Sequence, residues 1–326
     1  MNASMNREAD SIRLVDAGGT HELVTIELMR RRRLFERFGV EARRTLVANG
    51  GEAVDLLLGG QADVAMQVGF GPALKAIAKG APLRVIAASN LLTVHAIYTR
   101  DPKIRRLADL TGRTVGIGAR GALTHQLIFA ALTKAGVDPA GVNFVTIGNS
   151  ASIFQALLAG DLDAGFGETE VFDHQDHYGV HALEDAVLWR ELPDFPNQAS
   201  FATEDAIRDR RDVLVRTLAA HAALYRTLHD PGARDAFAAS RAAALPGSDP
   251  AETEVQWRFY QENRPFAEDL ELSPVKLDYM QDLNIAMGLQ TARLSYAAVA
   301  DMSLAREAVA LLDAHTPPLE KNNRHG

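Results

Sequence analysis

Apolar residues recur in two alternating spacings along the first 190 positions. Short apolar runs rich in β-branched residues are typical of buried strands, and between them apolar positions return every three or four residues, as on one face of a helix. Strands that alternate with helices form a mostly parallel sheet covered by helices, so the pattern predicts two α/β lobes. The predicted strands are Ile12–Val15, Val40–Val47, Asp63–Val68 and Leu83–Ala88, then Thr114–Gly118, Asn143–Ile147 and Asp163–Gly167.

Helical spacing of apolar residues occurs between these strands and predominates in the later part of the chain. The connecting helices are predicted at Glu22–Phe38, Glu52–Leu58, Pro72–Ala78, Ala122–Ala135 and Ala151–Leu158. After Pro193 the spacing is helical almost throughout, and such helices usually pack back on one lobe of an α/β protein. These later helices are predicted at Thr203–Leu228, Ala233–Ala243, Glu252–Glu262, Lys276–Gly288 and Asp301–Ala314.

One segment of the first half matches another that lies 100 residues later. Leu58–Ala65 reads LGGQADVA and Leu158–Gly165 reads LAGDLDAG. In each, a helix ends at a glycine, and an aspartate opens a buried strand after a short turn. Either each lobe contains the same structural unit, or turn chemistry alone produces the likeness.

Composition narrows the class of protein. With 326 residues, 47% of them hydrophobic, the chain can bury two modest cores. The formal charge is −8, and basic residues are scattered except for Arg30–Arg33, which we interpret as a solvated helical face; no nucleic-acid surface is predicted. The absence of cysteine excludes disulfides, thiolate metal sites, cysteine nucleophiles and a lipoprotein anchor.

Neither a metal site nor a membrane segment is predicted. Asp173–His177, with the sequence DHQDH, has metal-binding residue types, but no second cluster accompanies it and we interpret it as a solvated helical surface. No segment reaches the roughly 18 apolar residues of a membrane span. The first ten residues are polar and include no apolar stretch of a signal peptide. Either a signal was removed when the sequence was defined, or the protein works in the cytoplasm.

Several segments, in their order and spacing, resemble a known family over about residues 11 to 300. They are Gly18–Thr20 after the first strand, Leu57–Val68 followed by Gly69-Phe70-Gly71-Pro72, Lys79–Ala87, Leu107–Gly116 and Gln155–Asp163. The chain is similar to the type II periplasmic substrate-binding proteins of the nitrate, sulfonate and taurine class, together with their thiamine-pyrimidine synthase relatives.

The resemblance implies a two-lobed periplasmic-binding-protein type II fold, each lobe a mixed, mostly parallel sheet flanked by helices. The chain would cross between lobes near Ser89–His95 and Gln198–Thr203. The first lobe would comprise residues 11–90 and 200–315, the second residues 95–197, with flexible tails at 1–10 and 317–326. The implied function is the solute-binding component of an ABC-type importer: a monomer that needs no cofactor, closes on a small ligand, and meets a permease if it is exported to the periplasm.

Ligands of open α/β sheets bind beyond the carboxyl ends of the strands, where loops lead into helix starts. Free N–H groups at a helix start favour an anion. In the first lobe Thr20 could equally cap its helix. The ligand-binding residues predicted from this lobe and the first crossing are Gly19, Thr20, His21, Val68, Gly69, Phe70 and Asn90.

The second lobe offers a cation and two carboxylates. Arg120, at a strand-to-helix loop, is the candidate partner for a sulfonate, carboxylate or nitrate-like ligand. Glu168 and Glu170 would repel an anion unless paired or protonated. They either cap the next helix or accept hydrogen bonds from an amine or a pyrimidine, which leaves a zwitterionic ligand open. The predicted ligand-binding residues here are Arg120, Gly121, Ala122, Thr124, Asn149, Glu168 and Glu170.

An enzyme or ligand sensor of the cytoplasm is the alternative, decarboxylase-like or pyrimidine-related. His21 and His125 each begin a helix in the pattern Thr-His-x-Leu, and facing histidines could serve as general acid and base. They could equally be satisfied structural residues. The pyrimidine synthases of this family have a cysteine-rich motif and its desulfinase a cysteine nucleophile, so a chain without cysteine argues against both. No serine elbow or nucleotide-binding glycine loop appears, and no catalytic residue is assigned.

Overall fold

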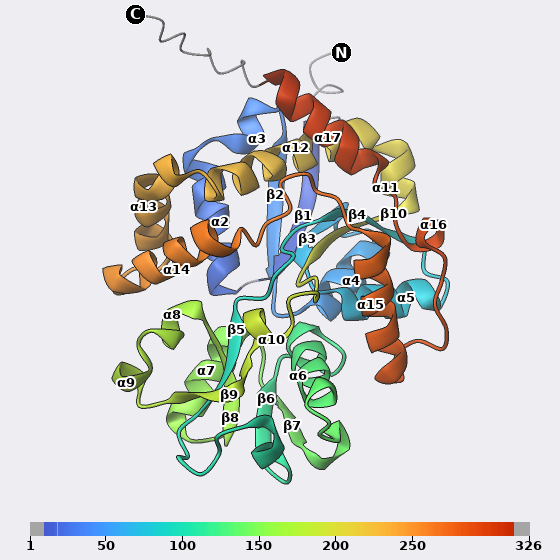
Figure 1. Cartoon of the computed structure of the whole chain (residues 1–326). Coiled ribbons are helices and arrows are strands. Elements are labelled where there is room, and N and C mark those ends of the chain that lie inside the picture. The colour runs from blue at the N-terminus through green and yellow to red at the C-terminus, as the bar shows by residue number, and fades with distance from the viewer. Residues whose placement is uncertain (1–9, 18, 316–326) are drawn as a thin grey trace, which may run out of the picture.

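The computed structural model describes residues 10–17 and 19–315, and their strands form two five-stranded sheets in separate lobes (Figure 1). The first sheet has the order β2-β1-β3-β10-β4, and the second the order β7-β6-β8-β5-β9. Strands of the first are β1 (Ser11–Ala17), β2 (Glu41–Val47), β3 (Val64–Val68), β4 (Leu83–Ala88) and β10 (Ala199–Thr203). Strands of the second are β5 (His95–Thr99), β6 (Thr114–Ile117), β7 (Asn143–Thr146), β8 (Ala164–Glu168) and β9 (His181–Val187).

Both sheets are mixed, as predicted for the fold class. β1 runs parallel to β2 and β3, and β6 runs parallel to β7 and β8. β10 is antiparallel to β3 and β4, and β5 is antiparallel to β8 and β9. The strands β5, β9 and β10 were absent from the sequence prediction, because a strand-then-helix pattern does not identify strands that follow a change of lobe or end an α/β series.

The chain passes between the lobes at residues 89–94, the first crossing, and at residues 192–198, the second crossing. The two crossings are bonded to each other: the Ser89 N–H donates to the Gln198 carbonyl (3.1 Å) and the Gln198 N–H to the Asn90 carbonyl (2.9 Å). The prediction that the second crossing spans Gln198–Thr203 was wrong beyond its first residue, since Ala199–Thr203 is β10, paired on both sides within the first sheet.

Helices of the first lobe come from both ends of the chain. Those interleaved with its strands are α2 (Thr20–Arg31), α3 (Leu34–Arg37), α4 (Gly50–Leu58) and α5 (Phe70–Ala78). Arg33 has a left-handed φ of 52°, which splits the single helix predicted over Glu22–Phe38. The helices after β10 lie with the first lobe (Figure 1), where α17 packs on α12 and α13 on α2. These are α11 (Glu204–Asp209), α12 (Arg211–Leu228), α13 (Arg234–Ala244), α14 (Pro250–Asn263), α15 (Pro274–Ala286), α16 (Tyr296–Val299) and α17 (Ser303–His315).

The second lobe is covered by fewer and shorter helices. Its longer ones are α6 (Leu123–Lys134) and α7 (Ser150–Ala159), and the single-turn helices are α8 (Thr169–Phe172), α9 (Gln175–Tyr178) and α10 (Leu188–Glu191). No helix of the described residues is long and apolar enough to span a bilayer. The flexible tails predicted at 1–10 and 317–326 lie outside the described residues, apart from Asp10.

The repeated segment is the same structural unit in each lobe. Asp63 accepts a hydrogen bond from the Arg13 N–H (2.8 Å) and returns its own N–H to the Arg13 carbonyl (2.9 Å). Asp163 makes the equivalent pair with Thr114, at 2.7 and 3.0 Å. Each aspartate therefore ties the start of a central strand to its parallel neighbour, which explains why the sequence repeats it.

The lobes are closed on each other. The Gln126 side chain of the second lobe accepts from the Gly71 N–H (3.1 Å) and donates to Asn284 Oδ1 (2.8 Å), both in the first lobe. Farther out, Arg258 of α14 pairs with Asp173 of the second lobe. These contacts bring the carboxyl ends of the strands of both sheets face to face.

Candidate functional site

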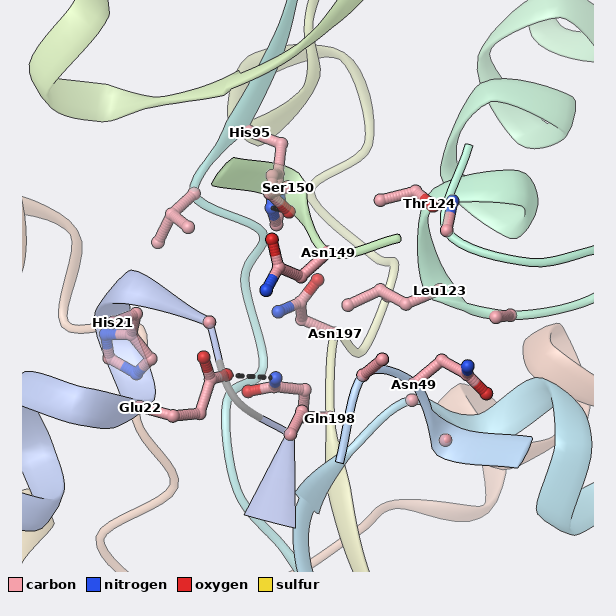
Figure 2. Close-up of a pocket in the computed structure, with 18 of the residues that line it drawn as sticks. His21, Glu22, Asn49, His95, Leu123, Thr124, Asn149, Ser150, Asn197 and Gln198 are labelled. Atoms are coloured by element: carbon pink, nitrogen blue, oxygen red, sulfur yellow. Dashed lines mark hydrogen bonds between the residues drawn. The ribbon is translucent and has the colours of Figure 1, made fainter. Parts of the chain in front are cut away.

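A cavity of about 80 Å³ lies where the strand ends of both lobes meet the two crossings (Figure 2); we call it the interlobe pocket. Five helix N-caps line it, one for each of α2, α4, α5, α6 and α7. Its lining comprises Ala17, Gly19, His21, Glu22, Ala48, Asn49, Gly50 and Gly69 of the first lobe; His95, Gly118, Ala122, Leu123, Thr124, Gly148, Asn149, Ser150 and Glu168 of the second; and Asn90, Val94, Asn197 and Gln198 of the crossings.

Several helix-start N–H groups around the pocket are already bonded by the protein itself. Asn49 Oδ1 accepts from the N–H groups of Gly51 (2.9 Å) and Glu52 (3.3 Å), and Asn149 Oδ1 accepts from Ser152 (2.9 Å). At the start of α5 the Gly71 N–H is taken by Gln126. These donors are therefore not available to an anion.

The crossings place unpartnered polar atoms against the pocket. The Asn90 Oδ1 atom accepts from the Leu92 N–H (3.2 Å), while Asn90 Nδ2 has no partner. The Gln198 Nε2 atom donates to Glu22 Oε1 (2.7 Å), the dashed line in Figure 2, while Gln198 Oε1 has none. Asn197 Oδ1 is unpartnered as well. A buried polar atom without a partner costs about 1–3 kcal/mol, so these atoms favour the binding of a polar molecule in the pocket.

Two buried carboxyl groups line the pocket. Burial raises the pKa of Glu22, opposed by the hydrogen bond from Gln198. Burial also raises the pKa of Glu168 well above its ordinary value, and the neighbouring Glu170 adds to the rise. Glu168 Oε2 has no hydrogen-bond partner. No lysine or arginine is among the pocket-lining residues of the described chain.

Two neutral histidines flank these carboxyl groups. His21 Nδ1 lies 2.6 Å from the Tyr260 hydroxyl, and its Nε2 has no partner. His95 is bonded on both sides, to Thr93 Oγ1 (2.9 Å) and Ser150 Oγ (2.8 Å). Burial lowers the pKa of each to about 4, so both rings are uncharged near neutral pH.

The structure brings eight of the fourteen predicted ligand-binding residues together at the pocket: Gly19, His21, Gly69, Asn90, Ala122, Thr124, Asn149 and Glu168. It does not bring the other six there: Thr20, Val68, Phe70, Arg120, Gly121 and Glu170. Thr20 and Glu170 line the adjoining cavity described below.

The remaining four have other surroundings. Val68 and Phe70 are buried in the apolar core, Phe70 edge-on to Phe201. Gly121 donates its N–H to His125 Nδ1 (2.8 Å). Arg120 is exposed to solvent on the loop before α6 and is not among the pocket-lining residues.

The expectation that His21 and His125 face each other was also wrong. His125 is outside the lining, edge-on to Phe144 with a centroid distance of 4.9 Å. Its Nδ1 accepts a hydrogen bond from the Gly121 N–H (2.8 Å). His95 occupies the facing position instead.

An adjoining cavity of about 530 Å³ shares Ser150 and Glu168 with the interlobe pocket. Arg241 lies on its wall, 1% exposed, 2.9 Å from Glu252 and 3.8 Å from Glu170 across the lobes. This single arginine is shared by two carboxylates. No group of three or more potential metal ligands occurs in the part of the chain that the structure describes.

Sequence reasoning missed six polar lining residues: Glu22, Asn49, His95, Ser150, Asn197 and Gln198. Gln198 carried a usable signal, because an amide in a predicted lobe crossing has no role on a helix or strand, and Asn197 directly precedes it. Glu22 and Ser150 directly follow the predicted site residues His21 and Asn149, within the first turn of α2 and α7. His95 required knowledge of β5, which the sequence pattern did not identify.

A family model described as NMT1/THI5 like matches residues 32–232. No curated protein sequence matches the chain. In fold the chain is similar to the alkanesulfonate-binding protein SsuA from Xanthomonas axonopodis pv. citri bound to MOPS, at 19% identity and a TM-score of 0.73, covering 89% of this chain and 98% of that one.

Two further solved structures extend the range of similar proteins. The periplasmic nitrate-binding protein NrtA from Synechocystis PCC 6803 is 15% identical with a TM-score of 0.68, over 95% of this chain and 91% of that one. The desulfurization enzyme DSZB is 15% identical with a TM-score of 0.61, over 94% and 100%. At such identities the likeness establishes the fold, and the fold serves both binding proteins and an enzyme.

Proposed function

The chain belongs to the NMT1/THI5-like family, and from that premise we propose that it is the solute-binding component of an ABC-type importer, which captures one small polar molecule by closing its lobes. The observation that carries this proposal is the set of buried, unpartnered polar atoms on Asn90, Asn197 and Gln198, since all three lie where the lobes join and face a pocket walled by both.

Capture by closure follows from where these atoms lie. A ligand that satisfies atoms on the crossings while touching both lobes favours the closed state over the open one, which is the differential affinity that a closing motion requires. The hydrogen bonds between the crossings, at Ser89 and Gln198, hold the two connections together as one hinge.

An importer role gives the protein a permease as partner and a location outside the cytoplasm. The similar folds of SsuA and NrtA belong to binding proteins, and NrtA is a periplasmic one, which supports the location. Those two proteins bind an alkanesulfonate and nitrate, which supports the anionic class predicted from sequence as one candidate for the ligand.

The proposal is tested with the purified chain and a panel of small polar molecules of each charge. A ligand at 100 times its Kd raises the free energy of unfolding by about 2.7 kcal/mol, which a thermal-shift measurement detects. Small-angle scattering then compares the radius of gyration with and without that ligand. We expect stabilisation together with compaction; tight binding without compaction would contradict capture by closure. Deleting the gene should abolish uptake of the same ligand.

Catalysis on the bound molecule is the second candidate, favoured by the unpartnered Nε2 of neutral His21 in the pocket and by the enzyme among the similar folds. Mass spectrometry of the ligand after long incubation distinguishes the two roles. A binding protein returns the ligand unchanged, whereas an enzyme would return a product and lose turnover, but not affinity, on substitution His21→Gln.

A further inference from the structure

The hydrogen-bonding polarity of Gln198 is fixed by Glu22. The Glu22 carboxyl accepts from Gln198 Nε2 at 2.7 Å and is also hydrogen-bonded by the backbone of Gly19 and of Glu22 itself. A carboxylate accepts and does not donate, so the amide nitrogen of Gln198 must face Glu22. Gln198 Oε1 is then an acceptor, and the side chain is 4% exposed with no partner for that oxygen.

Asn90 has the opposite polarity for an equally local reason. Its Oδ1 accepts from the Leu92 N–H at 3.2 Å, so its Nδ2 is the free end. Asn90 is 1% exposed. The pocket therefore offers one fixed donor at the first crossing and one fixed acceptor at the second.

Glu168 adds a second acceptor from the other lobe. Its Oε2 is unpartnered and the residue is 8% exposed. Glu170 lies beside it, and the arginine closest to Glu170, Arg241, is already bonded to Glu252 at 2.9 Å. A carboxyl group in this position is best satisfied by an N–H donor, and best of all by a positively charged one.

Among the described residues, the pocket wall offers an anion no side-chain cation and fewer helix-start donors than the sequence suggested. None of the pocket-lining residues is a lysine or arginine. At the starts of α4, α5 and α7, one or two N–H groups each are hydrogen-bonded by Asn49, Gln126 and Asn149. The starts of α2 and α6 have no side-chain cap in the described part of the chain. Glu22 and Glu168 also line the pocket, and in its ionised form each carboxyl group would oppose the charge of an anion.

We infer that the captured molecule is a small uncharged or cationic nitrogen compound, an amide or amidine in its recognition chemistry, which donates N–H hydrogen bonds to Gln198 Oε1 and Glu168 and accepts one from Asn90 Nδ2. This inference rests on the proposed function, because it names the ligand class of the same pocket. It differs from the sulfonate or nitrate-like ligand that the sequence predicts, since that prediction depended on Arg120 and on free helix-start donors.

The test uses two skeletons, each with three matched end groups: acetate, acetamide and acetamidinium; benzoate, benzamide and benzamidinium. Within a series the size is constant, while the end group changes from two acceptors to one donor and one acceptor and then to donors alone. Nitrate and taurine complete the panel. Calorimetry gives Kd, and scattering gives compaction. We expect the amide or amidinium of at least one skeleton to bind tenfold or more tightly than its carboxylate.

The outcomes distinguish a failure of the inferred ligand class from a failure of the proposed binding function. Tightest binding by a carboxylate, nitrate or taurine, with compaction, overturns the inferred ligand class and leaves the binding function standing. Binding of an amide or amidinium without compaction supports the ligand class and contradicts capture by closure. No binding across the panel counts against both.

Single substitutions test which side chains contact the ligand. Glu168→Gln should weaken the amidinium tenfold or more and the amide less than threefold, because it removes a charge and keeps an acceptor. Gln198→Leu should weaken the binding of both the amidinium and the amide, since it removes an acceptor for the N–H groups of either ligand. Glu184→Gln, on an exposed carboxylate of β9 that pairs with Arg105, is the matched control and should leave every Kd unchanged. An amidinium that binds Glu168→Gln as tightly as the parent protein would contradict the assigned contact.

Discussion

The two lobes are built around the same unit yet contribute unlike walls to the pocket. On the second lobe the polar side chains are mostly occupied within that lobe: Thr124 Oγ1 accepts from the Gly118 N–H (2.7 Å), and Ser150 Oγ is bonded to His95 Nε2 (2.8 Å). On the first lobe and the crossings, His21, Asn90 and Gln198 each retain a buried atom without a partner. Glu168 is the exception on the second lobe.

This difference indicates that lobe closure and ligand recognition depend on different walls of the pocket. A wall whose polar groups are already satisfied can approach a ligand without needing its hydrogen bonds, so the second lobe provides shape and excludes water. The first lobe and the crossings bear the unsatisfied groups, and they bind only a molecule that completes them. Substitutions in the two walls should therefore affect different measurements.

The largest effect is expected from blocking closure. A Cβ added at Gly71 would lie 1.9 Å from the Gly121 carbonyl oxygen of the other lobe. Gly71→Ala must then hold the lobes apart, and a closure cost of about 3 kcal/mol lowers affinity roughly 100-fold. Scattering should show no compaction with any ligand.

The control for this substitution is Gly141→Ala, whose added Cβ would meet only Thr111 Cγ2 at 3.4 Å within the second lobe. It should leave affinity and compaction as in the parent protein. If Gly71→Ala still compacts with ligand, the closed contact between α5 and the loop before α6 is not the bound state.

The next largest effect is expected when one residue from each wall of the pocket, Asn90 or Ser150, is replaced by alanine. Asn90→Ala removes an unsatisfied donor and should cost about 1–2 kcal/mol of binding, a tenfold or greater rise in Kd. Ser150→Ala removes a partner of His95 and should instead lower the free energy of unfolding by about 1–2 kcal/mol. We expect its Kd to change less than threefold. Equal effects of both on Kd would show that the walls are not divided in this way.

Sequence alone predicted the α/β alternation, the two-lobe fold class and eight pocket-lining residues, because each depends on short-range information. A glycine or asparagine that follows a buried strand and begins a helix, such as Gly69 or Asn149, lies at the strand end whatever the tertiary packing. Arg120 was assigned from its place in a strand-to-helix loop and from its charge. Whether its long side chain turns toward the pocket or to solvent depends on how the second lobe meets the first.

The residues that decide which hydrogen-bonding atoms are free in the pocket could not be predicted, for a related reason. The free atom of Gln198 is an acceptor only because Glu22, 176 positions away, fixes its amide. His95 reaches the pocket from β5, a strand formed by pairing with β8 and β9 on both sides rather than by a local pattern. Long-range contacts of this kind leave no spacing in the sequence.

Stability should also distinguish the lobes through their repeated aspartates. The Asp63 side chain is 6% exposed and pairs with Arg13 (2.6 Å) and Arg210 (3.1 Å), whereas that of Asp163 is 34% exposed and only 3.6 Å from Arg113. Replacing either by Asn keeps the backbone acceptor and removes the charge. We expect a loss of about 1–2 kcal/mol for Asp63→Asn and under about 0.5 kcal/mol for Asp163→Asn by urea unfolding.

The pH dependence of this difference follows from Asp63. Burial raises the pKa of Asp63, but the hydrogen bonds from Arg13 and the charge of Arg210 outweigh it, so the net shift is downward. A lowered native pKa contributes stability that is present above the unfolded value of about 3.9 and is lost as pH falls through the native pKa. The gap between the two variants should therefore narrow below about pH 4, and a gap that widens in acid would contradict the ion pairs.

A smaller effect is expected from the titration of Glu168. Burial and Glu170 raise its pKa, which favours its protonated form, whereas a cationic ligand favours the ionised form, so binding should release a proton at pH values below that pKa. Benzamidinium affinity should rise with pH by up to about tenfold per unit below that pKa and level off above it. Calorimetry in buffers of different ionisation enthalpy should detect the released proton, and Glu168→Gln should abolish both signals.

The smallest effect is expected at Arg120, and it bears most directly on the contrast between the walls. If the second lobe recognises an anion, Arg120→Ala should weaken binding at least tenfold, because a guanidinium is the strongest partner for a sulfonate or carboxylate. The structure leads to the opposite expectation, since Arg120 is exposed and outside the lining. Its recorded influence is on His125, whose pKa is lowered to about 4 by burial and further by Arg120. Arg120→Ala should therefore raise the pKa of His125 in an NMR titration, which shows that the charge has been removed, while Kd stays within about twofold. A tenfold loss of affinity would show that Arg120 contacts the ligand and would support an anionic ligand.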